Sequence, residues 1–74
     1  MSPMAHIRKS VFGVSQAHFA AIAGVSQATV SRWERFEWEP NRDELARIRE
    51  EALRRGIKWS DTLFFQSALK GEAA

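Results

Sequence analysis

Residues 13–34 read GVSQAHFAAIAGVSQATVSRWE, and the string GVSQA occurs in them twice, with its copies eleven positions apart. An eleven-residue repeat is typical of right-handed helical supercoils, but a glycine at the start of each copy interrupts a continuous helical seam. In each copy the residues instead follow the order that is typical where one helix ends and the next begins. The glycine ends one helix with a positive φ, and the serine, Ser15 or Ser26, caps the next helix. The repeat therefore predicts two successive helix starts.

Helix signals extend over the rest of the chain, and alternating strand patterns are missing from it. Proline follows the first cap, and Asn41 and Glu44 have the spacing of a capping box. Five short helices are expected, beginning near Ser2, Ser15, Ser26, Asn41 and Ser60. We predict an all-α fold, with one domain over residues 1–70 and a frayed tail at residues 71–74.

The charge distribution favours an anionic partner for the first half of the chain. The net charge is +2 at pH 7, but residues 1–36 carry +3 and residues 37–74 carry −1. The basic excess thus lies in the half that contains the repeat. A surface with ordinary scattered charges is the alternative reading of the same numbers.

Composition argues against several other classes of protein. Cysteine is absent, so neither a disulfide framework nor a thiolate metal site is available. His6 and His18 have no further ligands at metal-binding spacing, and we expect no metal and no cofactor. Without an activated serine, a paired carboxylate or a phosphate-binding glycine loop, we expect a protein that is not an enzyme. The longest apolar run, Phe19 to Val25, is too short to cross a membrane, so we expect a cytoplasmic protein.

The distance between the two helix starts has a further meaning. It leaves room for a helix of about two turns, roughly 12 Å long, followed by a tight turn. This is the spacing of a helix-turn-helix. The second helix is amphipathic when it is drawn at about 100° per residue. One side carries Gln27, Ala28, Ser31, Arg32 and Arg35, and the opposite side carries Thr29, Val30 and Trp33.

At these residues the chain resembles the Cro and phage-repressor class of helix-turn-helix regulators, which is also known as the xenobiotic-response-element class. The resemblance runs through Gln16, Phe19, Ala20, Ala23, Gly24, Val25, Val30, Trp33 and Glu34, and more loosely through residues 40–53. It implies a five-helix, lambda-repressor-like domain in a prokaryotic or phage-encoded protein associated with the nucleoid. It also implies that Glu34 pairs with a basic residue of the first helix, either Arg8 or Lys9.

The polar side of the second helix supplies the candidate base-reading residues. Glutamine presents a donor and an acceptor to the edge of adenine, and arginine presents two donors to guanine. We therefore expect Gln27 and Arg32 to read bases, with Ala28 on a thymine methyl group and Ser31 as a weaker discriminator. An ordinary amphipathic surface helix is the alternative for any of these residues taken singly.

Phosphate contacts are expected beside the reading helix. The resemblance implies that Gln16 binds a backbone phosphate and braces Gln27. Ser15 and Ser26 begin helices whose free N–H groups attract anions, and Arg35 and Arg42 add positive charge. One departure from the family is clear: it places a glycine and basic residues after Arg35, whereas this chain continues with Phe36, Glu37, Trp38 and Glu39.

Two functions are compatible with these features. The first is a sequence-specific regulator of transcription that binds double-stranded DNA as a homodimer, acting as a repressor on a palindromic operator. The second is an antitoxin or other interaction module that binds a partner protein as well as its own operator. Either interface would use the apolar residues near the C-terminal end of the sequence, which are Trp59, Leu63, Phe64 and Phe65.

Overall fold

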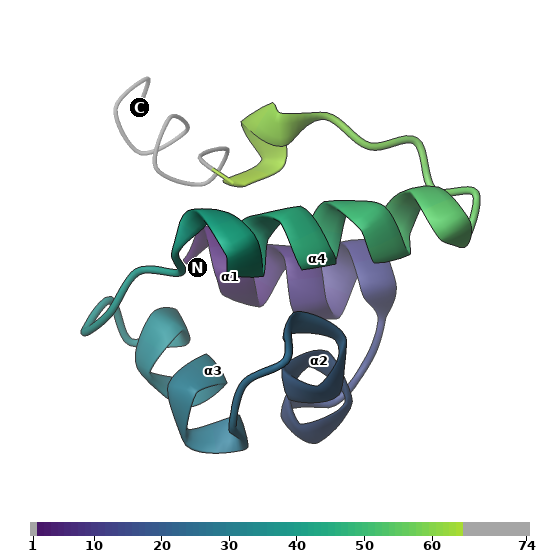
Figure 1. The fold of residues 1–74 in the computed structure, drawn as a ribbon. Helices are drawn as coiled ribbons and strands as arrows, with labels where there is room; N and C mark the ends of the chain where they lie inside the picture. Colours follow the sequence, from purple (N-terminus) through teal and green to yellow (C-terminus); the bar gives the residue numbers. More distant parts are fainter. Residues whose placement is uncertain (1, 65–74) are drawn as a thin grey trace.

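Helices are the regular secondary structure of the described part of the protein. A computed structural model describes residues 2–64, and Met1 and residues 65–74 lie outside the described part. Residues 2–64 contain four α-helices and no strand, so the predicted all-α class is confirmed (Figure 1). The elements are α1 (Pro3–His6), the π-helical segment η1 (Ile7–Phe12), α2 (Gln16–Ala23), α3 (Gln27–Glu34), α4 (Arg42–Arg54) and the 3-10 helix η2 (Asp61–Phe64).

The helix starts follow the predicted caps. The Ser15 and Ser26 hydroxyls accept hydrogen bonds from the third helical amides of α2 and α3, at 3.1 and 3.2 Å. Asn41 and Glu44 form a reciprocal capping box at the start of α4, with both bonds at 2.8 Å. Each bond satisfies an amide that has no partner inside its helix. The prediction that the two GVSQA copies are helix starts is confirmed.

The last expected helix differs from what the structure shows. Instead of an α-helix beginning at Ser60, residues Asp61–Phe64 form one 3-10 turn. The hydroxyl of Ser60 accepts a hydrogen bond from the amide of Thr62 at 3.3 Å, which is a local turn rather than an α-helical cap. The remainder of the expected helix, from Phe65 onward, lies outside the described residues.

Every longer helical segment contributes to a single core. The largest fully buried side chains are Ile7 from η1, Phe19 from α2, Val30 from α3 and Ile48 from α4. Phe19 meets the edge of Trp33, with ring centroids 6.4 Å apart and planes at 85°. Burying side chains of this size stabilises a fold by about 1.5–3 kcal/mol each. The core therefore ties η1, α2, α3 and α4 together.

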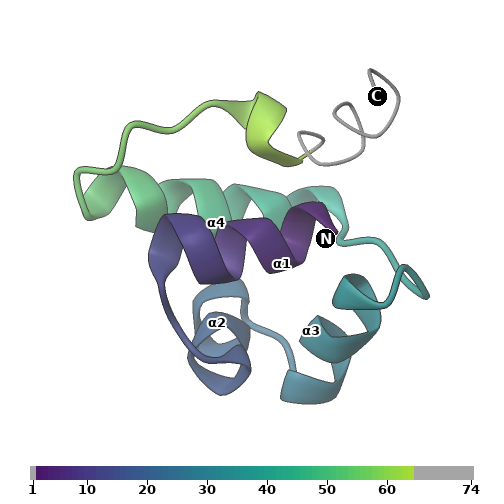
Figure 2. The same ribbon diagram turned by 180° about the vertical axis from the view of Figure 1, so that it is seen from behind.

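The packing of the helices places α2 and α3 together. Helix α2 packs against both α3 and α4, and α1 packs against α3 and η2. Helices α2 and α3 lie on the side of α4 opposite η2 (Figures 1 and 2). The buried residues Ala20, Ala23 and Ala52 have small side chains, which allow the helices to pack closely. The arrangement leaves the outer side of α3 at the surface of the molecule.

The turn between α2 and α3 requires glycine. Gly24 has φ +74°, a left-handed backbone conformation that residues other than glycine rarely adopt. A Cβ atom at this position would lie 2.6 Å from Nη1 of Arg47. That same nitrogen donates to the carbonyl of Ala23 at 3.3 Å, so α4 closes over the turn.

Phe36 occupies the corresponding left-handed position at the end of α3, with φ +63°. The amide of Glu37 donates to the carbonyl of Arg32 at 2.9 Å, and the amide of Phe36 donates to that of Trp33 at 3.2 Å. These two bonds define a Schellman motif, in which glycine is the usual residue at this position. The side chain of Phe36 is 72% exposed. The fold therefore gains little from this ring while the backbone is strained.

Replacing Phe36 with glycine should stabilise the protein. Removing left-handed strain contributes about 1–2 kcal/mol, and the extra freedom of glycine in the unfolded chain offsets part of it, which leaves a gain of about 0.5–1 kcal/mol. Urea denaturation followed by circular dichroism measures this gain. Phe36→Ala is the matched control, because it removes the ring but keeps the strain, and it should not stabilise. A Phe36→Gly protein no more stable than Phe36→Ala would contradict the explanation.

Candidate nucleic-acid interface

The candidate site is built on α2, α3 and the three residues between them, Gly24–Ser26. The amide of Val25 donates to the carbonyl of Ala20 at 2.9 Å, which closes the turn directly onto α2. Buried Ala20 and Ala23 let α3 pack closely against α2. The turn therefore fixes where α3 begins, and the core fixes which side of α3 faces inward.

The two sides of α3 differ as the helical wheel predicts. Val30 and Trp33 are buried in the core. Gln27 and Ala28 are exposed, and Ser31 and Arg32 are half-buried. The four expected base-reading residues thus lie together on the side of α3 that faces away from the core. The side chain of Gln27 makes no hydrogen bond within residues 2–64.

An ion pair connects this helix to η1. The guanidinium of Arg8 donates from Nε and Nη2 to the two carboxylate oxygens of Glu34, at 2.5 and 3.1 Å. Both side chains are only 12% exposed. Nη1 of Arg8 also donates to the carbonyl of Val14, at 3.0 Å. Of the two partners expected for Glu34, the structure selects Arg8.

Gln16 joins the same group. Its amide nitrogen donates to Oε1 of Glu34 at 3.2 Å, so η1, α2 and α3 meet at one carboxylate. The side chains of Gln16 and Gln27 make no hydrogen bond with each other in the described chain. Gln16 is thus held by Glu34 rather than by the first residue of α3.

Glu34 is ionised more readily than an ordinary glutamate. Burial is the largest single influence and favours the neutral acid, but the hydrogen bonds from Arg8 and Gln16 and the charges of Arg8 and Lys9 together outweigh it. The net effect lowers the pKa of Glu34 below its ordinary value of 4.5. The pair is therefore fully charged at neutral pH.

The expected phosphate-binding residues surround α3. Ser15 and Ser26 are exposed at the N-terminal ends of α2 and α3, where unpaired amides and the helix dipole favour an anion. Arg35 and Arg42 are exposed at the end of α3 and the start of α4. Nε of Arg35 lies 3.5 Å from Oε2 of Glu37, so its charge is partly neutralised within the chain.

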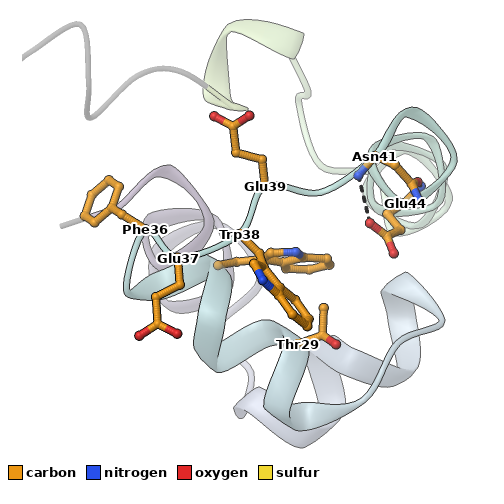
Figure 3. Close-up of a pocket in the computed structure, with 8 residues that line it drawn as sticks. Thr29, Phe36, Glu37, Trp38, Glu39, Asn41 and Glu44 are labelled. Carbon is orange, nitrogen blue, oxygen red and sulfur yellow. Dashed lines mark hydrogen bonds between the residues drawn. The ribbon is translucent and has the colours of Figure 1, made fainter.

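An open hollow lies between α3, α4 and the segment that connects them. It is lined by Thr29, Trp33, Phe36, Glu37, Trp38, Glu39, Asn41 and Glu44 (Figure 3). Phe36 and Glu39 extend away from the centre of this hollow, whereas the ring of Trp38 turns toward Thr29 (Figure 3). The carboxylate of Glu44 is used by the capping box with Asn41. The acidic side chains therefore do not converge on a common point.

Two contacts near α3 were not anticipated from the sequence. Arg47 donates to the turn carbonyl of Ala23, although its position among the mixed charges of α4 gave no sign of this contact. The guanidinium of Arg32 lies over the ring of Trp38, 4.5 Å from its centroid. The aromatic residue in an acidic stretch was the only available signal for the second contact.

The apolar residues expected at an interface are largely used inside the chain. Phe64 is buried in the core, and Trp59 and Leu63 are half-buried against it. The Trp59 and Phe64 rings have centroids 5.2 Å apart. Phe65 lies outside the described residues, so its part in an interface stays a prediction.

Comparisons with known proteins do not assign a family. No protein-family model, no curated protein and no solved structure matches this chain. Within residues 2–64, no group of three or more His, Cys, Asp or Glu side chains is placed to hold a metal ion. None of the described helices has the length and apolar character needed to span a membrane.

Glu34→Gln should lower stability by about 1–3 kcal/mol at pH 7, because Arg8 loses its charged partner in a nearly buried position. A lowered folded-state pKa makes the contribution of Glu34 complete above its ordinary pKa and removes it as the pH falls through the folded value. The difference between wild type and variant should therefore shrink below pH 4.5.

Urea denaturation from pH 7 down to about pH 3 measures this difference across the titration range. Glu50→Gln is the control, because Glu50 is exposed on α4 and has no ion pair within the described residues. It should leave the stability profile unchanged. A gap between wild type and Glu34→Gln that is independent of pH would show that the charge of Glu34 does not stabilise the fold.

Proposed function

We propose that the protein binds double-stranded DNA in a sequence-specific manner, with α3 in the major groove. The observation that supports this most strongly is the pairing of α2 and α3 through the turn Gly24–Ser26, with a polar side of α3 left at the surface. An α-helix of this kind fits the width of the major groove. The group around Glu34 holds α3 against α2 and η1, which suits a helix that must enter the groove at a fixed angle.

The proposed base contacts follow from the chemistry of the exposed side. Gln27 is suited to adenine, Arg32 to guanine, Ala28 to a thymine methyl group, and Ser31 to either a donor or an acceptor. Gln27 and Ala28 are exposed in the first turn of α3, where base contacts in helix-turn-helix proteins concentrate. These residues would supply the sequence preference.

The proposed phosphate contacts would set the orientation of the protein on the duplex. They are the helix N-termini at Ser15 and Ser26, the side chain of Gln16, and the exposed guanidinium groups of Arg35 and Arg42. Such contacts contribute affinity without distinguishing sequences. We further propose that the protein regulates transcription as a repressor, by occupying its operator.

Selection of binding sites from random duplexes tests this function. The wild-type protein should return a defined motif. Gln27→Ala and Arg32→Ala should each relax one position of that motif and weaken binding to the preferred site by about 1–3 kcal/mol. Gln16→Ala should instead weaken binding to all sequences alike.

Arg54→Ala is the charge-matched control for Arg32→Ala. Arg54 is exposed at the end of α4 and pairs only with Glu51 among the described residues. It should leave the selected motif unchanged. A wild-type protein that enriches no motif would refute sequence-specific binding, and an unchanged motif with Gln27→Ala would remove that residue from the reading surface.

We also propose that the protein binds as a homodimer. One reading helix contacts only a few base pairs, whereas two copies related by a two-fold axis would read inverted half-sites about 34 Å apart. Trp59, Leu63 and Phe65 are the remaining candidates for the interface, because Phe64 is needed in the core. A partner protein seated on the same region is the alternative.

Sedimentation of the protein with and without its selected duplex measures the stoichiometry. Two copies per palindromic duplex are expected, and Phe65→Asp should reduce this to one copy with weaker binding. Leu53→Asp is the control, because Leu53 is an exposed apolar residue of α4 and lies outside the proposed interface. One copy of wild-type protein on a non-palindromic site would contradict the dimer.

A further inference from the structure

The segment that follows α3 folds back onto Arg32. The amides of Glu37 and Trp38 both donate to the carbonyl of Arg32, at 2.9 and 3.4 Å. The left-handed conformation of Phe36 makes this reversal possible. The last turn of α3 and residues 36–38 therefore form one local unit, in which the backbone of Arg32 is the common acceptor.

The side chain of Arg32 is held by the same two residues. Its guanidinium carbon lies 4.5 Å from the centroid of the Trp38 ring. Its Nη1 lies 3.5 Å from Oε1 of Glu37, and both of these charged side chains remain more than two-fifths exposed, at 43% and 45%. Stacking restrains the plane of the guanidinium, and the contact with the carboxylate restrains its rotation within that plane.

This arrangement leaves part of Arg32 free for another molecule. A guanidinium has five N–H donors in a fixed planar geometry. Only Nη1 has a hydrogen-bond partner within residues 2–64. Nε and Nη2 form the other edge of the guanidinium, and two adjacent donors of this kind match the O6 and N7 acceptors of guanine.

We propose that Trp38 is a specificity-determining residue, which with Glu37 positions Arg32 to read a guanine in the major groove. Trp38 itself need not touch DNA: it reduces the number of orientations that Arg32 must lose on binding. This role rests on the proposed DNA-binding function. It also gives the acidic segment a purpose, since Glu37 restrains an arginine instead of facing phosphates.

The test compares two duplexes that differ only at the position relaxed by Arg32→Ala, one with guanine and one with adenine. Trp38→Ala should reduce the preference for guanine by about two- to fivefold, which corresponds to the loss of one exposed cation–π contact. Trp38→Phe should retain most of the preference because it keeps an aromatic face. Trp38→Leu, which keeps apolar bulk without that face, should behave like Trp38→Ala.

Two controls separate positioning from a general structural effect. Phe36→Ala removes the neighbouring exposed ring and should leave the preference unchanged. In an Arg32→Ala background, Trp38→Ala should have no further effect on the guanine-to-adenine ratio. Equal weakening on both duplexes, or an unaltered ratio with Trp38→Ala, would overturn the role of Trp38.

Failure of this inference can be told apart from failure of the proposed function. A wild-type protein with no preference between any duplexes would refute sequence-specific binding itself. A wild-type protein with a motif that Trp38→Ala and Trp38→Leu both preserve would leave DNA reading intact and refute only the positioning role. Circular dichroism of each variant establishes that it is folded before its binding is measured.

Discussion

The ion pair between Arg8 and Glu34 is the interaction on which the geometry of α3 depends. It links residues 26 positions apart, and both of its side chains are nearly buried. Helix α3 has only eight residues, so few contacts set its direction. The Ser26 cap fixes its first turn, Val30 and Trp33 fix its inner side, and Glu34 fixes its last turn against η1 and α2. Loss of the charge at Glu34 would weaken the hydrogen bonds from Arg8 and Gln16 that hold this end.

At the end of α3, a strained backbone conformation is combined with a well-defined set of side-chain contacts. Phe36 adopts a left-handed backbone conformation that is usual for glycine. The chain reverses direction there, which brings Glu37 and Trp38 back onto Arg32. The two acidic residues that depart from the resembled family thus have different surroundings. Glu37 is placed between Arg32 and Arg35, whereas Glu39 extends away from the hollow (Figure 3). The two neighbouring guanidinium groups therefore offset part of the negative charge of Glu37.

Much of this fold could be predicted because its signals are local. Caps, helix-ending glycines and the two sides of α3 depend on residues within one or two turns of each other. The 3-10 turn at Asp61–Phe64 was not predicted, because a Ser60 cap signal does not reveal how the turn packs Phe64 into the core. The contact of Arg47 with Ala23 crosses 24 positions, and no local pattern encodes it. The predicted base-reading residues share a surface, but their function is not encoded by exposure alone.

Titration of the isotopically labelled protein with its selected duplex, followed by the amide resonances in NMR spectra, tests the central claim most directly. If α3 enters the major groove, the largest changes should occur from Ser26 to Arg32 and at Ser15 and Gln16. The outer side of α4, around Glu50 and Arg54, should remain nearly unchanged. Changes confined to α4, or no changes at duplex concentrations well above that of the protein, would contradict DNA reading by α3.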